Sequence, residues 1–171
     1  MPNQIAQSTR AGGHIPTPRL RLHPVNPAQA EQLANGDSPL ACVPDYPHAD
    51  THAAARMQRH SLEVDNWVPG FGLYLMVRRA DALVVGDIGF HTPPDARGAV
   101  EVSYGLAPSA RGHGFATEAL RALTAWAHDH GAATVLAQID PDNTASLAVV
   151  ARADFLEVRS DGARLRFRHQ G

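Results

Sequence analysis

The spacing of hydrophobic residues changes several times along the chain, and each change marks an expected element. Alternating polar and apolar residues predict strands at 17–24, 74–78, 83–90 and 100–106, and a β-branched run predicts another at 134–139. Helical periodicity predicts helices at 28–35, 51–62, 115–130 and 143–153. A last hairpin is expected from 155–159 and 164–169 around Asp161-Gly162. This order indicates an α/β or α+β fold with a mixed sheet.

For two of the helices the sequence also predicts a capping residue and the side that is buried. Asp50 or Thr51 is expected to cap the second helix, with Ala54, Met57 and Leu62 near its inner face. The third helix ends before a glycine, where a C-terminal cap belongs. Its apolar residues recur at helical spacing and predict one buried face, made of Ala119, Leu120, Leu123, Trp126 and Ala127.

The segment between strand 100–106 and the third helix has the composition of an anion site. It carries Arg111, Gly112 and Gly114, and no acidic residue precedes Glu118. Glycine lets backbone N–H groups approach a ligand closely, and a helix N-terminus attracts negative charge. A phosphate-like group is therefore one expectation, and a tight turn with a solvated arginine is the alternative.

Two motifs in order carry a family resemblance. The string Arg111-Gly112-His113-Gly114-Phe115-Ala116 resembles the R/Q-x-x-G-x-G/A signature of the GNAT acyltransferase superfamily. Its flanks, 104–108 and 116–119, look like the RimJ/RimL-like branch, and 143–149 is similar to that branch's N-x-x-S-x-x-V helix. The resemblance covers residues 17 to 169. It implies the GNAT fold, a mixed, mostly antiparallel central sheet with helices on both faces.

The resemblance also implies an activity and a donor site. The activity would be acetyl-CoA-dependent N-acetylation of a primary amine, on a small molecule or a protein N-terminus, by direct transfer in a ternary complex. A backbone amide near Leu106 would polarise the thioester carbonyl. The donor would be held by Leu106, Ala107 and Pro108 along the pantetheine arm, by Arg111, Gly112, His113, Gly114, Phe115, Ala116 and Thr117 at the pyrophosphate, and by Asn143 and Ser146.

For proton transfer the sequence offers several groups. Glu101 is the first candidate for the base, with His91 or a water molecule as alternatives. Glu101 could instead be a solvated residue of the strand with no catalytic role. Many members of the family use a tyrosine on the helix after the fifth strand as the general acid, and this chain has no tyrosine there. Ser146 is the candidate donor to the leaving sulfur, or else a first-turn residue in a capping pattern with Asn143.

Other features limit the expectations. The acceptor is expected among residues 37–72, where Tyr46, His48, Trp67 and Phe71 stand, but its identity is not indicated. Asp154 replaces the family's usual glycine and tolerates a left-handed backbone.

A non-catalytic CoA-binding regulatory domain is the alternative function. A nucleoside triphosphate enzyme is disfavoured, because no Lys-Ser/Thr pair follows the glycines.

Composition agrees with a single domain at 17–171 after a flexible tail at 1–16. The 171 residues are 44% hydrophobic and 19% charged, with a formal net charge of −2, so no nucleic-acid partner is expected. The one cysteine, Cys42, allows no intrachain disulfide and fits a cytoplasmic protein. No zinc-like spacing occurs among the ten histidines, so no metal is expected. No membrane segment is expected, and the chain would be a monomer or homodimer.

Overall fold

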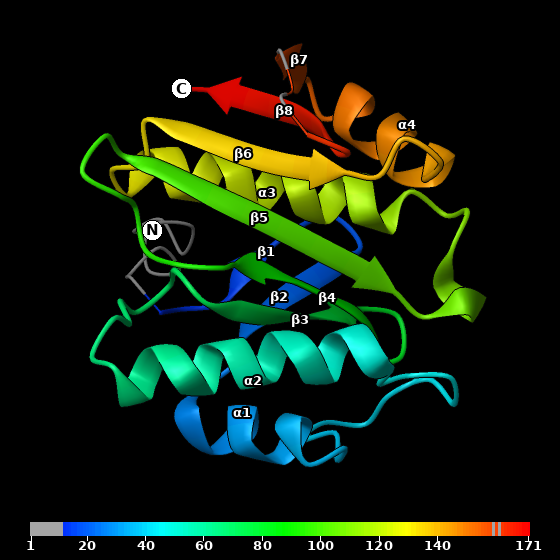
Figure 1. Ribbon diagram of the computed structural model, residues 1–171. Helices are drawn as coiled ribbons and strands as arrows, with labels where there is room; N and C mark the ends of the chain where they lie inside the picture. Colours follow the sequence, from blue (N-terminus) through cyan, green and yellow to red (C-terminus); the bar gives the residue numbers. More distant parts are fainter. Residues whose placement is uncertain (1–11, 159, 161) are drawn as a thin grey trace, which may run out of the picture.

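The computed structural model describes residues 12–158, 160 and 162–171, which form an eight-stranded sheet with four α-helices (Figure 1). The sheet order is β1-β2-β3-β4-β5-β6-β8-β7, and only β5 and β6 are parallel neighbours. The predicted mixed, mostly antiparallel sheet is thereby confirmed. The strands are β1 (Ile15–Pro16), β2 (Leu20–Pro24), β3 (Leu73–Arg78), β4 (Val84–Phe90), β5 (Ala99–Leu106), β6 (Thr134–Ile139), β7 (Leu156–Val158) and β8 (Leu165–Gln170).

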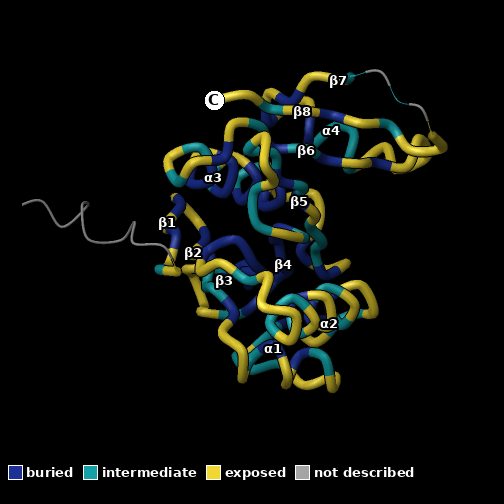
Figure 2. The backbone as a smooth tube through the Cα atoms, turned by 60° about the vertical axis from the view of Figure 1, so that its left-hand side comes forward, coloured by how far each residue is buried: buried dark blue, intermediate teal, exposed yellow. Residues whose placement is uncertain are grey.

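Helices lie on both faces of the sheet. Helices α1 (Pro27–Ala34) and α2 (Ala49–Glu63) pack together on one side of β2–β4, and α3 (Phe115–Asp129) lies on the other side (Figures 1 and 2). Helix α4 (Thr144–Arg152) contacts α3 and β6. The predicted inner face of α3 is confirmed, because its five apolar residues are all buried. Asp154, just after α4, has φ +63, the left-handed conformation that was expected.

Helix α2 differs from its prediction at its start and on its inner face. His48 is the N-cap residue, and the Thr51 hydroxyl donates instead to Asp87 of β4. The buried residues are Thr51, Ala55 and Gln58; of the predicted inner face, Ala54 is half-buried against the core and Met57 is 46% exposed. The prediction was wrong because two polar side chains of α2 are buried with hydrogen-bond partners, and an apolar pattern does not register them.

The predicted tail over 1–16 is too long. Ile15–Pro16 pairs with β2, and Ile15 is buried against the core. Residues 1–11 lie outside the described part of the chain. The hairpin of β7 and β8 is confirmed by its antiparallel register, although Asp161 of its turn also lies outside the described residues.

The opening between β5 and β6 is the feature that positions the site. The two strands pair only where Ala99–Glu101 faces Thr134–Leu136, whereas β5 keeps its pairing with β4 as far as Leu106. Beyond Glu101 the strands diverge (Figure 1). The open edge of β5 therefore presents backbone groups that β6 does not use.

Candidate functional site

A cleft of about 450 Å³ lies in this opening, between the end of β5, the glycine loop and α4. The structure brings most of the predicted donor-binding residues together on its walls. These are Leu106, Arg111, Gly112, Gly114, Ala116, Thr117, Asn143 and Ser146. One hollow thus contains a helix N-terminus at one end and an open strand edge at the other.

The anion end of the cleft is the N-terminus of α3. The first intrahelical bond of this turn runs from the Glu118 N–H to the Gly114 carbonyl. The N–H groups of Phe115, Ala116 and Thr117 therefore have no acceptor within the helix and are available to an anion. Gly112 and Gly114 have φ +78 and +80, a conformation that glycine adopts without steric cost.

Four predicted donor-binding residues do not line the cleft. Ala107 is fully buried, and its N–H donates to Val85 of β4, so that amide is not free to hold a ligand. Pro108 begins a short 3-10 helix, Pro108–Ala110. The Phe115 ring is buried and the His113 ring stacks on it. The side chains of these two residues therefore do not line the cleft, and only their backbone groups could contact a ligand there.

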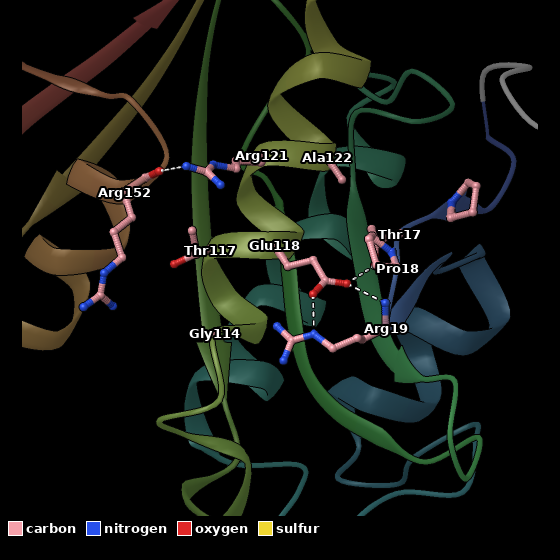
Figure 3. A pocket seen from close by; sticks show the side chains of 10 residues that line it. Thr17, Pro18, Arg19, Gly114, Thr117, Glu118, Arg121, Ala122 and Arg152 are labelled. Atoms are coloured by element: carbon pink, nitrogen blue, oxygen red, sulfur yellow. Dashed lines mark hydrogen bonds and ion pairs between the residues drawn. The ribbon is translucent and has the colours of Figure 1, made fainter.

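Arg19, on the turn before β2, fixes the glycine loop from outside, and sequence reasoning missed it. Its Nη1 donates to the His113 carbonyl at 2.7 Å, and its guanidinium lies 4.8 Å from the Phe115 ring centroid. Its Nε forms a 2.7 Å ion pair with Glu118, which also accepts from Thr17 (Figure 3). No local signal marks this contact, because Arg19 and Glu118 are 99 residues apart.

Glu118 is consequently turned away from the anion end and is neutralised. Burial raises the pKa of Glu118, but hydrogen bonds from the Thr17 hydroxyl, the Arg19 N–H and the Arg19 guanidinium outweigh this and hold the pKa below its usual value. The ionised carboxylate is therefore a fixed part of the loop's support, and it does not oppose an anion in the cleft.

Asp45 ties the α1–α2 connection to the same loop. Its carboxylate accepts from the Ser109 N–H and hydroxyl, both at 2.7 Å. These two hydrogen bonds lower the pKa of Asp45. The contact joins segments 64 residues apart and brings the residues before α2 to the cleft.

A second hollow, of about 630 Å³, adjoins the anion end. It shares Gly114, Thr117 and Arg152 with the cleft and extends along α3 to Arg19 and Arg121 (Figure 3). The Arg121 guanidinium donates to the Arg152 carbonyl, so α3 and α4 are linked here. Arg19, Arg121 and Arg152 line this hollow together with Glu118, so arginines outnumber carboxylates on its walls.

At the other end of the cleft, β5 and α4 meet. Asn143 caps α4, as expected, because its Oδ1 accepts from the Ser146 N–H at 3.1 Å. The Tyr104 hydroxyl of β5 donates to the Ser146 carbonyl at 3.3 Å. Burial raises the pKa of Tyr104 to about 12. The phenol is thus protonated near neutral pH, and it is a proton-donor candidate that lies on β5 and not on the helix after the fifth strand.

Glu101 and His91 lie together, because the residue after β4, His91, donates its backbone N–H to the Glu101 carbonyl of β5 at 3.0 Å. His91 Nδ1 is 3.4 Å from Glu101 Oε1, and the Gln138 amide donates to Oε2 at 3.1 Å. They line a small hollow of about 150 Å³, which shares Tyr104, Asn143 and Ser146 with the cleft. Glu101 therefore adjoins the end of the cleft where β5 and α4 meet, which we call the reactive end, without lining the cleft itself.

Of the residues proposed for the acceptor side, only His48 lines the cleft among the described residues. Tyr46 is buried and donates to Asp87. Phe71 is buried against Phe90 and Trp126. Trp67 borders a separate hollow of about 280 Å³ near β2.

Comparison with known proteins places the chain in a family. Residues 19–156 match the family model described as "Acetyltransferase (GNAT) domain", which is most of the chain. The chain belongs to the GNAT acetyltransferase family. The predicted family is thus confirmed, and the protein is an acyltransferase of the N-acetyltransferase class with acetyl-CoA as its acyl donor.

Individual relatives of this GNAT acetyltransferase are distant. The uncharacterised N-acetyltransferase YjdG of Bacillus subtilis is 26% identical over 113 residues, 66% of this chain and 67% of that one. A candidate ribosomal-protein-serine acetyltransferase from Vibrio cholerae superposes with a TM-score of 0.67 at 16% identity, over 94% of this chain and 99% of that one. The ribosomal L7/L12 acetyltransferase RimL, solved with coenzyme A, gives 0.64 at 19% identity, over 92% and 97%.

Two further expectations concern metals and membranes. Within the described residues, the structure contains no group of three or more potential metal ligands. None of the described helices is long and apolar enough to cross a membrane. Cys42 is half-buried, and its thiol donates to the Tyr46 carbonyl.

Proposed function

We propose that this GNAT acetyltransferase moves the acetyl group directly from acetyl-CoA to a primary amine, with both substrates bound at once. The observation that carries this proposal is the continuity of the cleft. A single hollow runs from the free N–H groups of α3 to Tyr104 and Ser146 in the β5–β6 opening. A long donor with phosphates at one end and a thioester at the other matches such a hollow.

The nucleotide part of the donor is proposed to extend into the second hollow. The pyrophosphate would meet the N-terminus of α3, where the shared residues Gly114 and Thr117 lie. The remaining phosphate of coenzyme A would then be near Arg121 and Arg152, which supply positive charge.

The thioester carbonyl is proposed to meet the N–H of Leu106. Successive N–H groups of a strand point to opposite sides. The Ala107 N–H donates to Val85 of β4, so the Leu106 N–H points toward the open side, where β6 has diverged. A donor fixed at that place would stabilise the oxyanion that forms on attack.

The acceptor is proposed to arrive from the side of Glu101. This carboxylate is held by His91 and Gln138 and adjoins the reactive end of the cleft. A carboxylate there attracts a cationic ammonium group and favours amines over alcohols or water.

Purified protein, acetyl-CoA and a panel of amines test the proposal. The panel contains small amines and peptides with free N-termini, and the release of coenzyme A thiol is measured. We expect release that depends on one amine class, with initial-rate lines that intersect when both substrates are varied, as a ternary complex requires. Binding of acetyl-CoA by calorimetry without release for any amine would favour the non-catalytic CoA-binding alternative.

Two variants test how the leaving thiolate is protonated. Ser146→Ala and Tyr104→Phe are each expected to lower kcat by about tenfold or more while acetyl-CoA affinity stays close to that of the wild type, because a donor to the leaving sulfur acts in the transition state. Calorimetry, turnover and melting temperature are measured on the same samples.

The outcome also separates catalysis from helix capping. If Ser146 is only a first-turn residue of α4, the Ser146→Ala variant keeps its turnover, and it also keeps the cap, because Asn143 bonds to the backbone N–H of residue 146. Tyr104 is then the remaining side-chain acid. Unchanged turnover in both variants contradicts a side-chain acid at this place.

A further inference from the structure

His48 occupies an unusual place at the reactive end of the cleft. It is the N-cap residue of α2, yet its side chain makes no capping bond and lies over Gly105 of β5. A Cβ atom at residue 105 would stand 3.2 Å from His48 Cε1 and 3.4 Å from Nε2. The ring therefore fills the space above the residue that precedes Leu106, where the thioester is proposed to lie.

The Nε2 atom of His48 is buried and has no hydrogen-bond partner among the described residues. Such an atom loses its hydration without compensation, unless a ligand supplies the missing partner. Because His48 lines the cleft, a molecule bound there is the available partner.

The atoms behind the ring indicate which nitrogen carries the proton. The Thr51 hydroxyl donates to the buried carboxylate of Asp87 at 2.6 Å, and His48 Nδ1 lies 3.5 Å from the same hydroxyl oxygen. A hydroxyl has one hydrogen, so toward His48 it presents a lone pair. Nδ1 is then the nitrogen that can donate to this oxygen, and Nε2 keeps a lone pair.

We propose that His48 Nε2 is the general base that takes the proton from the acceptor amine, an assignment that rests on the function proposed above. The amine nitrogen bonds to the thioester carbon as its proton passes to Nε2. The carbon–sulfur bond then breaks, and the coenzyme A thiolate takes a proton from the Tyr104 hydroxyl. The imidazolium then releases its proton to water and the tyrosinate takes one from water, so the net result is amide and thiol.

Position favours His48 over Glu101 for this step. Glu101 precedes Gly105 by four residues, or about 13 Å of extended strand. Both of its carboxylate oxygens are already engaged, by His91 and by Gln138. Glu101 is thus placed to attract the incoming ammonium, and His48 is placed beside the bond that forms.

The charged and titratable groups near His48 come from β4, β5, α2, the segment before α2 and the glycine loop. Asp87 stands behind it on β4, Asp50 follows on α2, and the Tyr46 ring lies 5.9 Å away edge-on. Tyr104 and Arg111 line the cleft that it faces. The two carboxylates favour the imidazolium that forms as the amine loses its proton.

Kinetics of His48→Gln, with His52→Gln as the matched control, test the proposal. His52 is one helical turn along α2, its Nε2 is also buried without a partner among the described residues, and it lies outside the cleft. His48→Gln is expected to lower kcat by about 100-fold, within the range for general base catalysis. His52→Gln is expected to keep the wild-type kcat, and both variants to keep wild-type affinity for acetyl-CoA by calorimetry.

The dependence of kcat on pH separates a base from a structural residue. The wild type should lose activity on the acid side, because a general base accepts a proton only in its unprotonated form, and His52→Gln should do the same. In His48→Gln this acid limb of the pH profile should not level off. Its turnover should keep rising with pH, because only acceptors that arrive deprotonated can react. Glu101→Gln is expected to raise KM for the amine by about tenfold and to keep the limb.

A measurement independent of turnover tests the proton's position. In protein labelled with ¹⁵N-histidine, the signals that disappear in His48→Gln should show Nδ1 protonated and Nε2 unprotonated. Thr51→Val should mix the two tautomers and lower kcat, and Thr51→Ser, which restores the hydroxyl, should recover both.

Each outcome has a distinct reading. If the wild type neither binds acetyl-CoA nor releases thiol with any amine, the proposed function itself fails. If the wild type is active and His48→Gln keeps its kcat and acid limb, the assignment to His48 is overturned. Loss of the limb in Glu101→Gln instead makes Glu101 the base.

Discussion

Gly114→Asp is expected to weaken acetyl-CoA binding by more than 100-fold while the fold is retained. Gly114 is the N-cap residue of α3 and lines the cleft with its backbone. Two unit charges about 4 Å apart interact by about 4 kcal/mol near a protein surface, so a carboxylate beside a bound phosphate exceeds the 2.8 kcal/mol that a 100-fold loss requires. Calorimetric titration with acetyl-CoA measures the effect.

The same substitution should be tolerated structurally. Aspartate adopts positive φ more readily than most residues, and the nearest atom to the new Cβ is Arg19 Nη2 at 3.3 Å, the mobile end of a cation. Gly131→Asp is the matched control, because Gly131 has φ +97, follows the other end of α3 and has open space around it. It should bind acetyl-CoA like the wild type. Equal affinity in both variants would place the pyrophosphate elsewhere.

Asp87→Ala is expected to lower the free energy of unfolding by about 3 kcal/mol. Asp87 is 5% exposed and accepts from the hydroxyls of Thr51 and Tyr46, which are themselves buried. Alanine leaves both hydroxyls without an acceptor, at about 1–3 kcal/mol for each buried group. Urea unfolding, compared with the wild type, measures the loss.

Asp87→Asn is the control for that loss, because an amide oxygen can accept from both hydroxyls, which share Oδ2 in the wild type. We expect it to be at least as stable as the wild type at pH 7. Its turnover should nevertheless fall above the raised pKa of Asp87, where the wild type carries a negative charge behind Thr51 and His48 and the variant does not. A stable Asp87→Asn with full activity would contradict a role for that charge.

The pH dependence of this comparison has a definite sign. Burial raises the pKa of Asp87, although hydrogen bonds from Thr51 and Tyr46 oppose the shift. The folded protein therefore keeps a proton that the unfolded chain releases. The corresponding stability is fully present below the ordinary aspartate pKa, near pH 4, and is lost as pH rises through the raised pKa. The advantage of Asp87→Asn over the wild type should accordingly grow from pH 4 to pH 7.

Local sequence determined the elements and one half of the site. Alternation, helical period and turn residues are properties of neighbouring residues, so β6 at 134–139 and the buried face of α3 could be predicted without a partner. The anion loop was predictable for the same reason. Gly112 and Gly114 need positive φ, and the helix that follows supplies its own free N–H groups.

Contacts between distant segments determined the other half. Arg19 supports the loop across 94 residues, and Asp45 reaches Ser109 across 64. Thr51 and Gln58 are buried on α2 although they are polar, because Asp87 and the backbone of neighbouring strands pair with them. A pattern along one element contains no information about such partners.

The chemistry at the reactive end is the clearest case. In the sequence His48 is one of ten histidines and Tyr104 one of three tyrosines, and no neighbouring residue marks either of them for proton transfer. Their proposed roles follow from the divergence of β5 from β6 beyond Glu101, which opens the cleft, and from the ring of His48 lying over Gly105. The sequence indicated the loop where we propose that the donor's phosphates bind, and only the tertiary structure, which lays the His48 ring over Gly105, decided which side chains lie beside the proposed thioester position.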